Sequence, residues 1–145
     1  MSALKVIREV VDPYVMRVVP GWLREQVGRI LATTIAFFFA FTLGADSRYS
    51  AAAYKGLRVF MPVHVWGSLF GIAALCIIGG ILSKRLRLLG QGLVLTATLH
   101  IFIAVGFFIQ ACHDQRASFA GAVAFSSIAA SIIAARMRLA QNTGA

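Results

Sequence analysis

Three histidines are the side chains of this sequence best suited to chemistry, and two of them lie at the ends of apolar stretches. His64 lies near the start of one stretch and His113 at the end of the next. Neighbouring antiparallel helices would therefore bring both imidazoles to the same depth in a membrane. Such a pair can ligate the iron of a b-type haem or another metal ion. Because both positions also have access to interfacial water, we expect no haem or metal cofactor, and His64 and His113 are the candidates if a haem binds.

The third histidine, His100, lies near the middle of an apolar stretch. An ionisable side chain inside a bilayer is costly and suggests a function, here a proton relay. Thr96 lies one helical turn earlier and offers a local partner, and a neutral imidazole needs only one or two hydrogen bonds. We therefore favour a buried structural role for His100 and Thr96. The apolar stretches contain no Asp or Glu, which argues against a transporter driven by protons or sodium ions.

The other reactive side chains form no catalytic pattern. Cys76 and Cys112 fall at different depths and belong to no Cys-x-x-Cys pair, which argues against an internal disulfide, a zinc site and c-type haem attachment. The sequence also has no glycine-rich phosphate loop and no paired carboxylates, the usual signatures of phosphate binding and acid–base catalysis. We predict that the protein is not an enzyme.

Composition and charge distribution indicate an integral membrane protein. Of 145 residues, 59% are hydrophobic and the mean hydropathy is +0.82, too apolar for a water-soluble globule. Stretches without Asp, Glu, Lys or Arg cover residues 30–45, 59–83, 88–113 and 117–135. Because roughly 20 apolar residues cross the hydrocarbon core, we predict an all-α polytopic protein. Its transmembrane domain, residues 22–138, would have four helices at about 24–45, 60–83, 88–112 and 117–136, followed by a tail over 139–145.

Residues 1–21 have the pattern of an amphipathic helix that lies in the membrane interface. Its apolar residues recur at helical spacing: Leu4, Ile7, Val11, Tyr14, Val15 and Val18. Pro20 and Gly21 should end this helix before the chain enters the bilayer. It would anchor the protein or pack over the bundle, or alternatively dock a partner. We expect the first apolar stretch to be retained, because its charged leader is too long for an ordinary signal peptide.

The basic residues predict the orientation in the membrane. An even number of spans places both termini on one side, together with the turn between spans two and three. That side would hold ten of the 14 Lys and Arg residues: Lys5, Arg8, Arg17, Arg24, Arg29, Lys84, Arg85, Arg87, Arg136 and Arg138. The positive-inside rule then predicts a multi-pass protein of the cytoplasmic membrane with both termini in the cytoplasm. The net charge of +9 favours contact with anionic lipids over nucleic acid, because the basic residues are dispersed.

Small residues predict close contacts between helices. Glycine removes side chains from a helix face and lets a neighbouring backbone approach. The glycines with this expected role include the Gly-x-x-x-Gly pair of the second span, and they are Gly67, Gly71, Gly79, Gly80 and Gly121. The fourth span, "ASFAGAVAFSSIAASIIAA", has Ala, Gly or Ser at most positions. We favour tight packing of this span, with a water-lining role for its serines as the alternative.

The segment "AYKGLRVFMPVHVWGSLFGIAAL" has Tyr and Leu ahead of a proline, followed by Trp-Gly and a second glycine inside a span. In this it resembles the second span of small four-span membrane proteins encoded by actinobacterial phages, several of which are proposed holins. The resemblance covers about a fifth of the chain, together with the four-span layout. It implies a protein that permeabilises the cytoplasmic membrane.

The sequence thus leads to one main functional hypothesis, a small membrane protein that acts by helix association. Copies would associate through Gly67, Gly71 and the Ala and Ser surface of the fourth span, and a dense assembly would open the membrane as a holin does. The alternative is a structural or regulatory subunit that binds a larger membrane complex through the same surfaces. A third hypothesis, a haem or transport protein, depends on His64, His113 or His100.

Overall fold

The computed structural model describes residues 21–43, 55–113 and 118–143, which form helices and short connections. The helices are α2 (Gly21–Leu43), α3 (Lys55–Phe60), α4 (Val63–Leu82), α5 (Leu86–His113) and α6 (Ser118–Thr143). Among these residues α2, α4, α5 and α6 are long and apolar enough to cross a membrane, so the predicted fold class, all-α with four such helices, is confirmed. The interfacial helix predicted before Gly21 lies outside the described residues.

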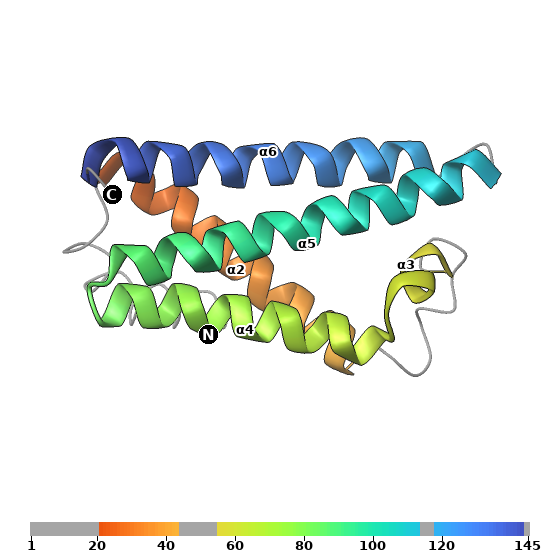
Figure 1. Cartoon of the computed structure of the whole chain (residues 1–145), viewed down its shortest axis with the longest axis horizontal. Helices are drawn as coiled ribbons and strands as arrows, with labels where there is room; N and C mark the ends of the chain where they lie inside the picture. Colours follow the sequence, from red (N-terminus) through yellow and green to blue (C-terminus); the bar gives the residue numbers. More distant parts are fainter. Residues whose placement is uncertain (1–20, 44–54, 114–117, 144–145) are drawn as a thin grey trace, which may run out of the picture.

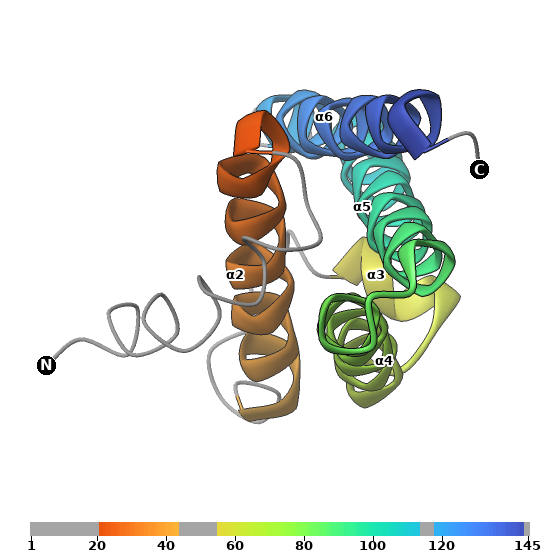
Figure 2. The same cartoon turned by 90° about the vertical axis from the view of Figure 1, so that its left-hand side faces the viewer.

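Three of the long helices form one layer, and the fourth crosses it. α5 packs between α4 and α6, and the three helices lie side by side (Figure 1). α2 runs obliquely behind this layer and packs mainly against α4, with a smaller contact to α6 (Figures 1 and 2). The centre of α5 is therefore where side chains from all four long helices can meet.

One end of the bundle, which we call the basic end, contains the start of α2, the turn between α4 and α5 and the end of α6 (Figure 1). Most described Lys and Arg residues lie in this half of the molecule, namely Arg24, Arg29, Lys84, Arg85, Arg87, Arg136 and Arg138. The other described cations, Lys55 and Arg58, belong to α3 at the opposite end. The fold therefore keeps together the described members of the set of charges on which the predicted orientation depends.

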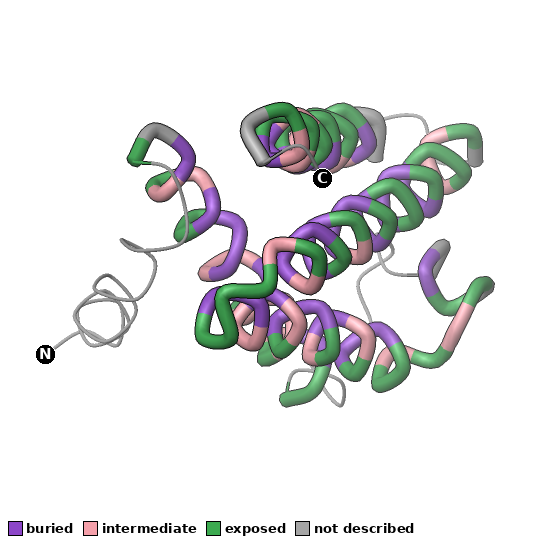
Figure 3. Tube along the Cα trace, turned by 60° about the vertical axis from the view of Figure 1, so that its left-hand side comes forward, coloured by how far each residue is buried: buried purple, intermediate pink, exposed green. Residues whose placement is uncertain are grey.

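The core consists of two apolar clusters joined along α4 and α5. The cluster toward the basic end includes Leu23, Ile77 and Leu93, and the other is rich in aromatic residues, among them Phe41, Phe70 and Phe107. Buried positions recur on the inward side of each long helix (Figure 3). In the second cluster Trp66 donates a hydrogen bond from Nε1 to the Leu57 carbonyl over 3.4 Å. This bond ties the short helix α3 to α4.

Local chemistry explains the helix boundaries. Pro62 immediately precedes α4, where the missing N–H and the fixed φ of proline fit the start of a helix. α4 ends in a Schellman-type turn, in which the Arg85 amide donates to the Gly80 carbonyl and the Lys84 amide to the Ile81 carbonyl. α6 continues to Thr143, beyond the end predicted near residue 136, because no glycine or proline interrupts the chain before Gly144.

Candidate functional site

His100 lies at the junction of the four long helices. The side chain is on α5 and is fully buried. Its ring meets Phe37 of α2 and Phe70 of α4 edge-on, at centroid distances of 5.3 and 5.6 Å. Phe125 of α6 completes the enclosure at 6.0 Å. A histidine therefore occupies the centre of the bundle, surrounded by one phenylalanine from each neighbouring helix.

Only one nitrogen of this buried imidazole has a hydrogen-bond partner among the described residues. Nδ1 lies 2.7 Å from the Thr96 carbonyl oxygen, and because a carbonyl can only accept, Nδ1 carries the proton. In the neutral ring Nε2 is then an acceptor, and no described group donates to it. The predicted pairing with Thr96 therefore runs through the backbone. The Thr96 hydroxyl itself donates to the Gly92 carbonyl over 2.9 Å.

The surroundings of His100 limit its chemistry. The acidic side chain within the described residues is Glu25, which pairs with Arg29 on the exposed surface of α2. A relay of carboxylates leading to His100 is therefore missing from the described part of the chain. The same residues contain no group of three or more His, Cys, Asp or Glu side chains that could hold a metal ion. Nε2 remains able to accept one hydrogen bond from a small donor such as water.

The two haem candidates lie near helix ends opposite the basic end. His64 is exposed in the first turn of α4. His113 is the last residue of α5, and its side chain lies outside the described part of the chain. The rings packed against His100 belong to phenylalanines. The described geometry thus brings no second imidazole to the one buried histidine.

The Gly-x-x-x-Gly pair of α4 packs against α2 of the same chain. A Cβ atom on Gly67 would lie 2.8 Å from the Thr42 hydroxyl, and one on Gly71 would lie 3.0 Å from the Phe38 ring. The hypothesis of association between copies through Gly67 and Gly71 needs correction, because α2 already covers this face within one copy.

The other predicted packing glycines also make contacts within the bundle. Gly80 adjoins the backbone of Leu89, and a Cβ on Gly79 would lie 3.4 Å from Leu88. On α6, a Cβ on Gly121 would lie 2.7 Å from the Phe107 ring. Gly92 of α5 was not among the glycines predicted to pack; a Cβ on it would lie 2.9 Å from the Ile77 amide nitrogen. With Gly80, it lets α4 and α5 approach each other at backbone distance.

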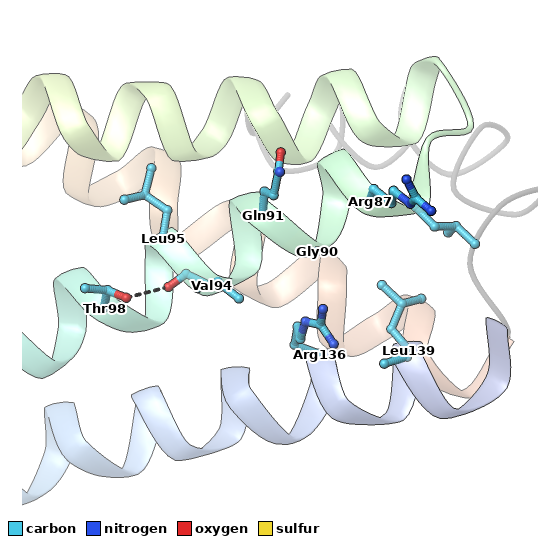
Figure 4. Close-up of a pocket in the computed structure, with 10 residues that line it drawn as sticks. Arg87, Gly90, Gln91, Val94, Leu95, Thr98, Arg136 and Leu139 are labelled. Atoms are coloured by element: carbon cyan, nitrogen blue, oxygen red, sulfur yellow. Dashed lines mark hydrogen bonds between the residues drawn. The ribbon is translucent and has the colours of Figure 1, made fainter. Parts of the chain in front are cut away.

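A groove of about 540 Å³ lies between α5 and α6 toward the basic end (Figure 4). Arg87 and Gly90 of α5 and Arg136 of α6 line its polar part, and Val94 and Leu95 continue it along α5. This groove was not predicted from the sequence. The signal available was Arg136, the first cation after the uncharged part of α6.

The outward surfaces of the long helices differ in character. α4 and α5 expose large apolar side chains, such as Ile72 and Leu75 on α4 and Phe108 on α5. α6 exposes a row of small residues at helical spacing, which we call the α6 small-residue face: Ala120, Ala124, Ser127 and Ser131. Within its apolar window only 22% of the residues are buried, against 56% for α5. Large apolar side chains suit lipid, whereas small residues suit contacts between helices.

Comparison with known proteins adds no relative to this description. No protein-family model, curated protein or solved structure matches the chain. Its own helices identify it as a small polytopic membrane protein with four candidate transmembrane helices.

Proposed function

We propose that this protein acts by lateral association in the cytoplasmic membrane, with copies meeting at the α6 small-residue face. A sufficiently dense assembly would permeabilise the membrane, as a holin does. The supporting observation is the contrast between two outward rows of side chains. One exposed row of α6 has only Ala and Ser, with larger exposed side chains such as Val123 and Met137 elsewhere on the helix, whereas Ile72 and Leu75 make the exposed surface of α4 suitable for lipid. Gly67 and Gly71 have no part in this interface, because they pack on α2.

The physical basis is that lipid tails are as apolar as leucine, so transmembrane helices gain little from hydrophobic burial alone. They associate where small side chains allow close backbone contact and where hydroxyl groups can bond across the interface. Ser127 now donates its hydroxyl to the Val123 carbonyl over 2.9 Å. Its oxygen still has capacity to accept a bond from a neighbouring helix.

Cysteine cross-linking in native membranes tests this interface. In a chain that also has the substitutions Cys76→Ala and Cys112→Ser, Ser127→Cys should form a disulfide-linked dimer on mild oxidation. The matched control is Leu75→Cys, which replaces another exposed residue, on the outward side of α4. Dimers of equal yield from both positions would indicate random collision and contradict the proposed interface.

Membrane potential tests the consequence of association. Induced expression in a bacterium should cause a delayed and sudden loss of potential. Ser127→Leu should postpone this loss, because the larger side chain keeps the helices apart. Ser126→Leu makes the same chemical change on the exposed surface one residue away and should leave the timing unchanged.

Two other results would redirect the proposal. Continued growth and potential, with the protein present in the membrane, would remove the holin-like role. Co-purification of one stoichiometric partner would then support the alternative, a subunit whose α6 small-residue face binds a different membrane protein.

A further inference from the structure

We propose that the groove at the basic end binds one anionic phospholipid, with the lipid phosphate between Arg87 and Arg136 and an acyl chain along α5. This inference does not depend on the proposed association of copies through the α6 small-residue face. It concerns the side of α6 that faces α5.

The placement of Arg136 supports an anion site in this groove. This residue lies within the candidate span Ala120–Gln141 and is half-buried against α5. A cation at this depth is costly unless it reaches the interface or meets an opposite charge. Arg136 and Arg87 form no ion pair or side-chain hydrogen bond with another described residue, and Glu25 is engaged by Arg29. Among the described residues, the two guanidinium groups that line this groove therefore have no anion, and a phosphate is an anion that guanidinium groups bind through paired hydrogen bonds.

Gly90 gives the groove room for a ligand beside Arg136. A Cβ atom on this residue would lie 3.9 Å from Arg136 Nε, so the bare backbone of α5 leaves room beside the guanidinium. Figure 4 shows Arg136 reaching from α6 toward Gly90, with Arg87 beyond it on α5. The volume of about 540 Å³ is in the range of sites that hold small organic ligands.

The groove continues along α5 as an apolar surface that suits an acyl chain. Val94, Leu95 and Thr98 follow Gly90 along the groove. The Thr98 hydroxyl donates to the Val94 carbonyl over 2.9 Å (Figure 4), so its donor is satisfied within the helix. A polar head region thus adjoins an apolar wall that runs toward the middle of the bundle. A phospholipid has this distribution of polarity, and a free soluble anion does not.

The turn that precedes α5 adds further basic residues beside the groove. Lys84 adopts φ 56° at the position of a Schellman turn where glycine is favoured. The strained backbone places Lys84 and Arg85 beside Arg87, around a second hollow of about 460 Å³. The first turn of α5 contains no acidic residue, so the positive end of its dipole adds to this field. The orientation predicted by the positive-inside rule would set this cluster against the cytoplasmic leaflet, which is rich in anionic lipid.

Native mass spectrometry of the full-length protein, released from detergent micelles, tests the site directly. The probes are phosphatidylglycerol and phosphatidylcholine with identical acyl chains. We expect one phosphatidylglycerol to be retained about 25-fold more tightly, from two basic contacts of roughly fivefold each. Arg87→Gln and Arg136→Gln should each weaken that binding about fivefold and leave phosphatidylcholine unaffected.

Two further variants separate the groove from a general effect of charge. Gly90→Leu keeps every cation but fills the space beside Arg136, and it should also weaken phosphatidylglycerol binding. Arg58→Gln removes an exposed cation from α3, at the opposite end, and should change nothing. Circular dichroism verifies that each variant keeps its helical content.

Several outcomes would overturn the proposal. Equal affinity of the unmodified protein for the two lipids would do so without any variant. An equal loss of binding in Arg58→Gln would show attraction by net charge alone. Displacement of the lipid by millimolar inorganic phosphate would show that the site recognises a free anion.

Discussion

At the residue scale, His100 shows how a polar group can be kept at the centre of a membrane bundle. Its Nδ1–H group donates a hydrogen bond to the Thr96 carbonyl one turn away. Its ring is packed edge-on against Phe37 and Phe70. Because the donor is satisfied within α5 itself, burial leaves only the Nε2 acceptor without a protein partner among the described residues. An unpaired acceptor in an apolar enclosure costs stability.

This arrangement predicts opposite effects for two substitutions of His100. His100→Leu fills most of the volume and removes the unpaired acceptor, so the stability should stay unchanged or rise by about 1 kcal/mol. His100→Ala leaves a cavity among the phenylalanine rings and should cost roughly 2–4 kcal/mol. Unfolding of the protein in mixed micelles, followed by circular dichroism, measures both. If His100→Leu proves as damaging as His100→Ala, Nε2 has a partner that contributes to the fold.

At the element scale, glycines set how closely the helices approach. Gly67 and Gly71 receive α2, while Gly80 and Gly92 bring α4 and α5 together. Because these contacts are made within one chain, they belong to the fold of a single copy, and the proposed association is assigned to the α6 small-residue face. Gly28 differs from them, since nothing lies within 4 Å of the position its Cβ would take.

Alanine substitution should therefore separate packing glycines from exposed ones. Gly92→Ala would push a methyl group against the Ile77 backbone and should destabilise the protein by about 1–3 kcal/mol. Gly28→Ala adds the same methyl group on an open surface of α2 and should stabilise by up to about 1 kcal/mol through helix propensity. The same micelle unfolding assay compares them. Equal effects at both positions would mean that α4 and α5 do not meet at Gly92.

At the scale of the whole molecule, most of the described Lys and Arg residues lie at one end of a four-helix unit. The α4–α5 turn and the ends of α2 and α6 meet there, while α3 lies at the other end (Figure 1). The distribution of charge, together with four candidate spans, predicts that the basic end faces the cytoplasm.

Thiol labelling of intact cells tests this orientation. The exposed Cys112, retained in a Cys76→Ala background, should react with a membrane-impermeant maleimide at an expression level that preserves the membrane potential. Ser83→Cys, at the exposed α4–α5 turn, in a chain with Cys76→Ala and Cys112→Ser, should react only after the cells are opened. The reverse pattern would place the basic end outside and would remove the cytoplasmic leaflet as the source of the bound lipid.

The sequence by itself determined the helices and the distribution of charge along them. Long apolar stretches without charge require spans in which each backbone group bonds within its own helix, and proline and glycine mark several of their boundaries. This is local information, which explains why the four long helices could be predicted, and why His100 could be recognised as a buried polar residue on α5.

Only the tertiary structure decided which surfaces meet. Gly67 and Gly71 have the same spacing whether they face α2 or a second copy, and hydropathy cannot distinguish these partners because lipid and helix surfaces are equally apolar. The junction of Phe37, Phe70 and Phe125 around His100 joins residues far apart in the chain. The same holds for Arg87 and Arg136, which α5 and α6 bring to one groove. Spacing within a helix fixes the face on which a side chain lies, but packing decides what covers that face.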